Sequence, residues 1–151
     1  MHSFYSISNQ NDFFDILPDD WRIDIAGIWD SYSKTSSIYL LESKQIIVAG
    51  GIVFSTCPPD MLYNKEEAQK WFDEGYLCIG YLWVPEEYRG KNFGSKWLQS
   101  LMKKHPSQKF WLTIEEESLT SFYEKNGFQL VKSLQKGNDK EWLLVDEPKS
   151  N

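Results

Sequence analysis

Residues 81–95 read Tyr-Leu-Trp-Val-Pro-Glu-Glu-Tyr-Arg-Gly-Lys-Asn-Phe-Gly-Ser. An apolar run ends at Val84, Pro85 stops it, and a short polar turn follows. From Phe93 onward, apolar residues recur at helical spacing, at Trp97, Leu98, Leu101 and Met102. The stretch therefore predicts a strand, a tight polar loop and a helix.

The predicted loop has the properties of an anion site. Unpaired backbone N–H groups and the positive end of the helix dipole meet at such a helix start, and they bind phosphate. Gly90 and Gly94 allow positive φ and a close approach of the backbone, and Asn92 tolerates the left-handed region. Arg89 and Lys91 add cations suited to a pyrophosphate or a ribose phosphate. The loop predicts a phosphorylated cofactor, with an ordinary turn before a core helix as the alternative.

Two other phosphate-binding patterns do not fit this loop. A Walker loop ends in Gly-Lys-Ser/Thr, and the sequence has no such ending here. The G-x-G-x-x-G spacing of a dinucleotide-binding fold is not met, and no acidic partner strand follows. The loop belongs to another class of phosphate site.

Two motifs resemble the GNAT superfamily of N-acetyltransferases. The acetyl-CoA loop of that family reads Arg/Gln-x-x-Gly-x-Gly/Ala; here Arg89, Phe93 and Gly94 are in register, and Asn92 replaces the central glycine. Residues 119–128, Leu-Thr-Ser-Phe-Tyr-Glu-Lys-Asn-Gly-Phe, are similar to the closing helix of the family, Phe/Leu-Tyr-Glu-Lys-x-Gly-Phe. The asparagine and alanine that often precede this tyrosine in the family are missing. The resemblance covers roughly residues 36–145, most of the chain.

The resemblance implies a fold and an activity. The fold is of the α+β (mixed α/β) class: a central mixed, mostly antiparallel sheet of about seven strands, with helices on both faces and the cofactor cleft between the fourth and fifth strands. The activity is transfer of an acetyl group from acetyl-CoA to a primary amine of a small molecule, peptide or protein, by direct attack on the thioester. A non-catalytic acyl-CoA-binding module is the alternative, since the strand at 76–84 lacks the carboxylate that often serves as the base in this family.

The loop and the preceding strand are expected to hold the donor. The loop amides, with Ser95, would bind the pyrophosphate. By resemblance, the strand backbone pairs with the pantetheine arm and supplies an amide for the thioester carbonyl. The residues expected to bind acetyl-CoA are Leu82, Trp83, Val84, Arg89, Gly90, Lys91, Asn92, Phe93, Gly94, Ser95 and Tyr123.

Two residues are expected to move protons. By resemblance, Tyr123 protonates the leaving thiolate, because a phenol with a pKa of ~10 stays protonated at neutral pH; the alternative is a core tyrosine beside Phe122. An alkylammonium of pKa ~10.4 needs a proton acceptor. Glu115 is the candidate base, within an acidic run, 115–117, that could equally complement a helix dipole. Tyr81 or a water chain could serve instead.

The composition agrees with a small enzyme. The chain has 151 residues, which we expect to form one domain over residues 1–147, with a disordered tail at 148–151. A net charge of −6 argues against a nucleic-acid partner and weakly favours cationic acceptors. No apolar run approaches the ~20 residues of a membrane span, and no signal peptide is present, so no membrane partner and a cytoplasmic location are predicted.

Cysteine and aromatic usage add two expectations. Cys57 and Cys78, with two distant histidines, make neither a zinc site nor a disulfide scaffold, so no metal is expected. Seven Trp, eight Tyr and nine Phe are compatible with a homodimer if some of them are exposed. The acceptor itself is not encoded in any motif.

The remaining elements are expected from periodicity and turn signals. Strands are expected at 3–8, 36–42, 45–55, 76–84, 109–115, 128–134 and 141–145. Helices are expected from Asn11 or Asp12 to Leu17, from Asp19 or Asp20 to Tyr32, at 94–105, and from a Ser118 cap to Asn126.

Three local features complete these expectations. The pair Gly50-Gly51 predicts a bulge or a close backbone approach. The strand, helix and strand from 76 to 115 predict a parallel crossover. Residues 57–75 form an insertion with a short helix, in which Asn64 and Glu67 make a capping-box-like pair. The helix either packs on the main sheet, the favoured reading, or forms a mobile wall over the acceptor pocket.

Overall fold

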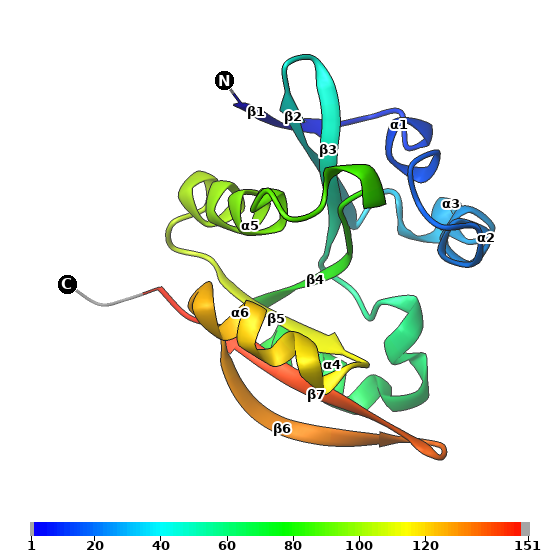
Figure 1. Cartoon of the computed structure of the whole chain (residues 1–151). Helices are drawn as coiled ribbons and strands as arrows, with labels where there is room; N and C mark the ends of the chain where they lie inside the picture. Colours follow the sequence, from blue (N-terminus) through cyan, green and yellow to red (C-terminus); the bar gives the residue numbers. More distant parts are fainter. Residues whose placement is uncertain (1, 149–151) are drawn as a thin grey trace.

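A seven-stranded sheet in the order β1-β2-β3-β4-β5-β7-β6 organises the chain. The computed structural model describes residues 2–148. Figure 1 shows helices on both sides of the sheet. The expected mixed, mostly antiparallel sheet with helices on both faces is confirmed. Of the expected tail, residues 149–151 lie outside the described residues.

The elements follow the sequence patterns closely. The strands are β1 His2–Ile7, β2 Ser36–Ser43, β3 Ile46–Phe54, β4 Tyr76–Trp83, β5 Lys109–Ile114, β6 Gln129–Lys136 and β7 Asp139–Asp146. The α-helices are α1 Asn11–Phe14, α2 Asp19–Ala26, α3 Trp29–Tyr32, α4 Lys65–Asp73, α5 Phe93–Lys104 and α6 Thr120–Lys125. Three short 3-10 helices are η1 Pro59–Asn64, η2 Glu86–Tyr88 and η3 Glu117–Leu119.

The central strands β4 and β5 pair over a short distance and then separate. They are parallel, as the crossover predicts, and pair from Tyr76 with Lys109 to Cys78 with Trp111. Beyond Cys78, β4 continues to Trp83 without a β5 partner. The two ribbons diverge in Figure 1. We call this open wedge the β4–β5 seam.

A bulge bends β4 on its other side. Gly50 pairs with Trp83 and Ile52 with Gly80, so one β3 residue faces two β4 residues between these pairs. Tyr81, one of the two, has a φ of +57°, which is rare for a bulky residue. The glycine pair also gives close approaches: a Cβ at Gly50 would lie 2.5 Å from Phe13, and one at Gly51 2.7 Å from Trp97. Both features predicted at Gly50-Gly51 are present.

The N-terminal helices and three caps differ from the prediction. One helix was expected to reach Tyr32, but α2 ends at Ala26, because the weak helix former Gly27 follows, and α3 starts afresh at Trp29. The first helix ends at Phe14 rather than at residue 17. The caps expected at residues 11 or 12, 19 or 20, and 118 are not made, since the cap positions fall at Gln10, Pro18 and Leu119 without a side-chain bond.

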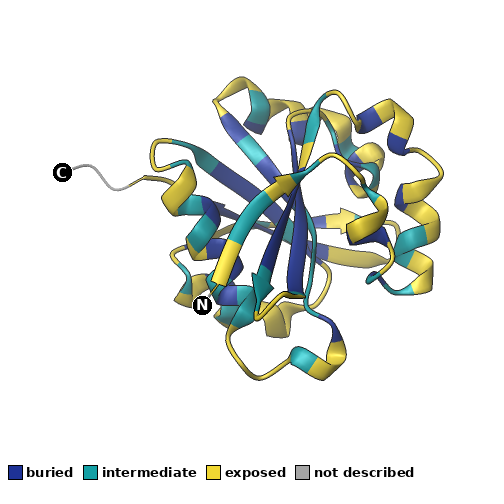
Figure 2. Cartoon of the chain, turned by 90° about the horizontal axis from the view of Figure 1, so that it is seen from above, coloured by how far each residue is buried: buried dark blue, intermediate teal, exposed yellow. Residues whose placement is uncertain are grey.

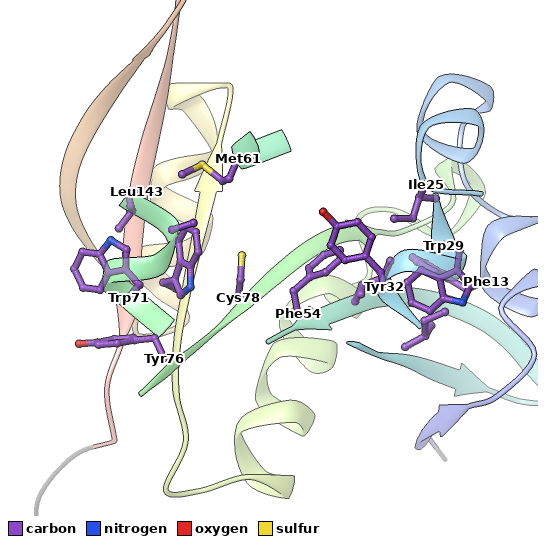
Figure 3. Packing of buried hydrophobic residues seen from close by; sticks show 14 of the residues in the cluster. Phe13, Ile25, Trp29, Tyr32, Phe54, Met61, Trp71, Tyr76, Cys78 and Leu143 are labelled. Carbon is purple, nitrogen blue, oxygen red and sulfur yellow. The ribbon is translucent and has the colours of Figure 1, made fainter. Parts of the chain in front are cut away.

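Each face of the sheet carries its own apolar layer (Figure 2). Helices α1–α4 cover one face through residues such as Phe13, Trp29 and Trp71, some of which are drawn in Figure 3. Helices α5 and α6 cover the other face, where Trp97 and Leu101 are fully buried. Both layers contain tryptophan side chains, which bury a large apolar area. This burial stabilises the sheet at the seam.

The insertion packs on the sheet, as favoured. Trp71 meets Tyr76 of β4 with ring centroids 5.1 Å apart, and Phe72 meets Trp111 of β5 at 5.6 Å. The predicted capping pair is also present, because Asn64 Oδ1 accepts from the Glu67 amide at 3.4 Å. The helix is therefore fixed against both strands of the seam.

Candidate active site

The loop between β4 and α5 adopts the conformation that its residues predicted. Gly90 has a φ of +80° and Asn92, at the helix N-cap, a φ of +65°. The helix begins at Phe93. Residues 89–92 are exposed, so a ligand can reach them. Two left-handed residues in three turn the chain sharply and direct its amides toward one region.

The amides of this loop are free to bind. Among the described residues, the amides of residues 90–95 donate to no backbone or side-chain acceptor. The pairing resumes at Lys96, whose amide donates to the Asn92 carbonyl at 3.0 Å. A row of unpaired N–H groups at the start of a 12-residue helix is an anion site by both geometry and dipole.

The loop is anchored to both neighbouring elements. Arg89 Nε donates to the Val84 carbonyl at 3.0 Å, and its guanidinium lies 4.5 Å from the centroid of the Trp83 ring. On the helix side, Asn126 Nδ2 donates to the buried Ser95 Oγ at 3.1 Å. The Arg89 guanidinium is thus held over the end of β4. The Ser95 hydroxyl accepts the hydrogen bond from Asn126, while the Ser95 amide stays free.

The second motif folds against the first. Phe122 of α6 lies over the start of α5, where its Cζ would be 3.1 Å from a Cβ added at Gly94. Only a residue without a side chain fits there without displacing the ring. The structure therefore brings together two motifs that are about 25 residues apart in the sequence.

Tyr123 is a buried phenol with a free hydroxyl. It is 9% exposed, and its ring contacts Phe122 at 4.9 Å and Phe128 at 5.7 Å between centroids. No described residue forms a hydrogen bond with the hydroxyl. Burial raises the pKa of Tyr123 to about 12, so the side chain stays protonated at neutral pH.

Glu115 lies on the other face of the sheet from Tyr123. It follows β5 and is exposed, with Oε1 3.5 Å from Lys136 Nζ. Glu116 and Glu117 are exposed as well. The structure thus places the candidate acid, Tyr123, in the layer formed by α5 and α6. The candidate base, Glu115, lies on the other face, beside the β6–β7 hairpin. The open β4–β5 seam lies between the two faces.

Sequence reasoning missed two acidic residues near Glu115. Glu141 of β7 is 1% exposed and accepts a 2.7 Å hydrogen bond from the Tyr63 hydroxyl. Asp60 lies in η1. Burial raises the pKa of both carboxyls. The sequence did contain a signal for Glu141, because it lies two residues before the inward Leu143 and so on the same face of the strand. It contained no signal for Asp60, which follows two prolines in an insertion without a motif.

A shallow groove of about 500 Å³ runs beside the loop on the β3 side. It is lined by Asp15, Ile16, Leu17, Pro18, Ile46, Ile47, Trp83, Pro85, Glu86, Glu87 and Tyr88. Three of these residues are acidic and none is a lysine or arginine, so the groove repels phosphate. The anion site is the amide row at residues 90–95, none of which lines this groove.

The sequence matches the family model for the acetyltransferase (GNAT) domain over residues 34–130. The chain belongs to the GNAT family. No curated protein sequence matches it significantly. Membership of this family indicates an acyltransferase that uses acetyl-CoA, and the row of free amides at residues 90–95 fits that donor. The chain is an acetyltransferase of this family, for which acetyl-CoA is the acyl donor.

Solved GNAT structures share the fold at low identity. One is a Corynebacterium glutamicum protein named histone acetyltransferase HPA2 and related acetyltransferase. It gives a TM-score of 0.71 at 13% identity, and the match covers 99% of this chain and 98% of that one. An acetyltransferase from Elizabethkingia anophelis with acetyl-CoA bound gives 0.62 at 13%, covering 97% of each. Arabidopsis thaliana Naa50 with the bisubstrate analogue CoA-Ac-MVNAL gives 0.61 at 15%, covering 97% and 98%.

Two other kinds of feature are absent from the described residues. No helix in residues 2–148 is long and apolar enough to cross a membrane. Over the same range, no group of three or more His, Cys, Asp or Glu residues is arranged to hold a metal ion.

Proposed function

We propose that this GNAT protein transfers the acetyl group of acetyl-CoA to a primary amine of a small molecule, peptide or protein, which attacks the thioester directly. The observation that carries the proposal is the row of unpaired amides at residues 90–95, beside a β4 edge that β5 leaves unpaired. Bound acetyl-CoA supplies an activated acetyl group. The rest of the chemistry falls to the residues of this chain.

The loop and β4 hold and polarise the donor. The amides of residues 90–95 bind the diphosphate, with Lys91 nearby as an exposed cation. The free edge of β4 at Leu82–Val84 pairs with the pantetheine arm and directs one amide at the thioester carbonyl. A preorganised donor of this kind stabilises the transition state by ~3 kcal/mol.

Tyr123 stabilises the leaving sulfur. Its pKa of about 12 lies well above the ~8.5 of a thiol, so full proton transfer to the thiolate is uphill. The phenol acts mainly as a hydrogen-bond donor that lowers the energy of the developing negative charge. Burial favours this role, because a hydrogen bond in a dry site is stronger than one in water.

The acceptor is a primary amine, free or at the end of a peptide. The bisubstrate complex of Naa50 supports a peptide as one class, and the acidic face around Glu115 and Asp60 supports a cationic one. Glu115 stays the base predicted from sequence, with Tyr81 or water as alternatives. A cytoplasmic location and a homodimer stay predictions.

Coenzyme A binding and turnover test the proposal separately. Calorimetry with coenzyme A tests the amide row, and release of free thiol with a panel of amines tests transfer. We expect micromolar association and turnover with at least one amine, lost in Tyr123→Phe with binding retained. Tight binding without transfer to any amine would instead identify an acyl-CoA-binding module.

A further inference from the structure

We propose that Asp60, in η1, is the group that binds the ammonium of the acceptor and takes its proton. The inference rests on the proposed function and assigns a residue outside both family-like motifs. It replaces Glu115 in that role.

Asp60 faces both strands of the seam. On the β5 side, its carboxylate interacts with the Thr113 hydroxyl, two residues beyond Trp111, the last paired residue of that strand. On the β4 side, its charge acts on Cys78, where pairing ends, and on Tyr81 in the bulge. One carboxylate therefore lies at the point where the seam opens, on the face opposite α5 and α6.

Neighbouring side chains fix this position. Met61, the next residue in the chain, is fully buried and belongs to the same apolar layer as Cys78 and Tyr32. Figure 3 shows Cys78 between Met61 and Tyr32 on this side of the sheet. Because Met61 anchors η1 in the core, the side chain of Asp60 is held at the rim of the seam rather than on a free loop.

Asp60 combines access to solvent with protein neighbours on several sides. The residue keeps substantial contact with solvent, yet protein atoms crowd it from several elements. This burial raises the pKa of Asp60, and the nearby Lys136 partly offsets the effect. The titratable groups that its charge acts on, or that act on it, are Tyr32, Cys57, Tyr63, Cys78, Tyr81, Glu115, Lys136 and Glu141.

The other candidate bases are less suitable. Burial raises the pKa of Tyr81 well above that of a free phenol, so it holds its proton at neutral pH. Glu141 is 1% exposed and bound to Tyr63, where an amine cannot reach it. Glu115 is exposed and paired with Lys136. Asp60 combines access for a substrate with a raised proton affinity.

The charges around Asp60 favour a cation. One oxygen of the buried Glu141 has no hydrogen-bond partner in the described chain, and Asp60 is among the groups that act on this carboxyl. Asp24 of α2 adds a further negative charge near Tyr81. Lys136 is a cation near Asp60, but the carboxylates of Asp60, Glu115 and Glu141 outnumber it, so this cluster carries a net negative charge. An alkylammonium is the chemistry that completes such a site.

The reaction balances with Asp60 as the acceptor. The ammonium gives one proton to the carboxylate, and the freed nitrogen lone pair forms a bond to the thioester carbonyl carbon. The carbon–sulfur bond breaks, and sulfur keeps the electron pair. The second nitrogen proton is lost as sulfur is protonated, so the products are the amide, the thiol and one proton that Asp60 returns to water.

The test compares Asp60→Asn with Glu115→Gln on the full chain. We measure calorimetric affinity for coenzyme A, and kcat/KM against pH for an ordinary alkylamine and for trifluoroethylamine, which is largely neutral at pH 7. We expect Asp60→Asn to bind coenzyme A like wild type and to lose 100-fold or more in kcat/KM with the alkylamine. The loss shrinks below about 10-fold with trifluoroethylamine, which has little need of a base.

The alternatives give different results. A large loss in Glu115→Gln with normal Asp60→Asn would return the role to Glu115, and normal rates in both would assign it to water. An equal loss for both amines would make Asp60 a structural residue. Asp60→Glu, which keeps the carboxylate, should recover part of the rate. A wild type that binds coenzyme A but acetylates no amine would overturn the proposed function itself, whatever Asp60 does.

Discussion

The Asn126 side chain at the end of α6 donates a 3.1 Å hydrogen bond to the Ser95 hydroxyl at the start of α5. The same Nδ2 donates to the Phe122 carbonyl at 2.9 Å, and Gln99 reaches the Asn126 oxygen at 3.4 Å. One amide therefore ties the helix that carries Tyr123 to the helix whose first turn carries the free amides. The two motifs act as one unit because this bond joins them.

Replacing Asn126 by alanine should loosen that junction. The Ser95 hydroxyl, in a buried residue, loses its partner, which costs about 1–2 kcal/mol of unfolding free energy. Affinity for coenzyme A should fall about 3–10-fold, because the first turn of α5 is no longer held in place. Urea unfolding and calorimetry measure the two effects. Gln135→Ala, which removes a bond within the exposed β6–β7 turn, is the control and should leave affinity unchanged.

Position 92 tests the conformational argument for the loop. Asn92 has a φ of +65°, a region that costs a β-branched residue about 1–2 kcal/mol. Asn92→Gly should therefore keep coenzyme A affinity and raise stability slightly, whereas Asn92→Val should lower both. Thermal melts and calorimetry distinguish the two variants.

The β2–β3 turn offers a matched comparison for Asn92. Gln45, which lies outside the loop, has a φ of +68°. Gln45→Gly and Gln45→Val should show the same signs in stability with no change in affinity. If the glycine variant at position 92 lost affinity, the Asn92 side chain itself would contact the ligand.

Tyr123 should make stability fall above pH 10. Its pKa is about 12 in the folded protein and ~10 when unfolded, so the folded state holds the proton more tightly. The stabilisation is complete below pH 10 and is lost as the pH rises toward 12, by about 2–3 kcal/mol for the full shift. Urea unfolding at pH 8 and pH 11 should show a smaller difference for Tyr123→Phe than for wild type. An equal fall in both would mean that the phenol is in contact with water.

The loop was predictable because its chemistry is local. Residues 89–94 specify positive φ, cations and a helix start within a few positions, and the structure has each of them. The strands followed from alternation and turn signals, although Gln45, expected as the first residue of a strand, lies in the turn with Lys44, and both are left-handed. Local rules decide these elements without help from distant residues.

The acidic side of the site was not predictable, because it is assembled from three separate segments. Asp60, Thr113 and Glu141 are brought together by η1, β5 and β7, and no spacing in the sequence relates them. The break of the second helix came from packing as well as from the weak helix propensity of Gly27. Its apolar pattern ran on to Tyr32, while packing required Trp29 and Tyr32 to be buried and left Ile28 exposed. Tertiary packing overrode the helical period.

Glu141 should lower stability at neutral pH. Burial raises its folded pKa above the ordinary 4.5, so the unfolding free energy falls as the pH rises from that value through the folded pKa. Glu141→Gln keeps an oxygen for the Tyr63 hydroxyl and removes the charge, so it should be more stable than wild type by about 1 kcal/mol at pH 8. The gain should vanish near pH 4, where wild type is protonated, in urea titrations at both values.

Tyr63→Phe, which leaves the buried carboxylate without its donor, should instead lose about 1–3 kcal/mol at pH 8. A glutamine variant less stable than wild type at pH 8 would show that a cation compensates the charge of Glu141, with Lys136 as the neighbour to examine.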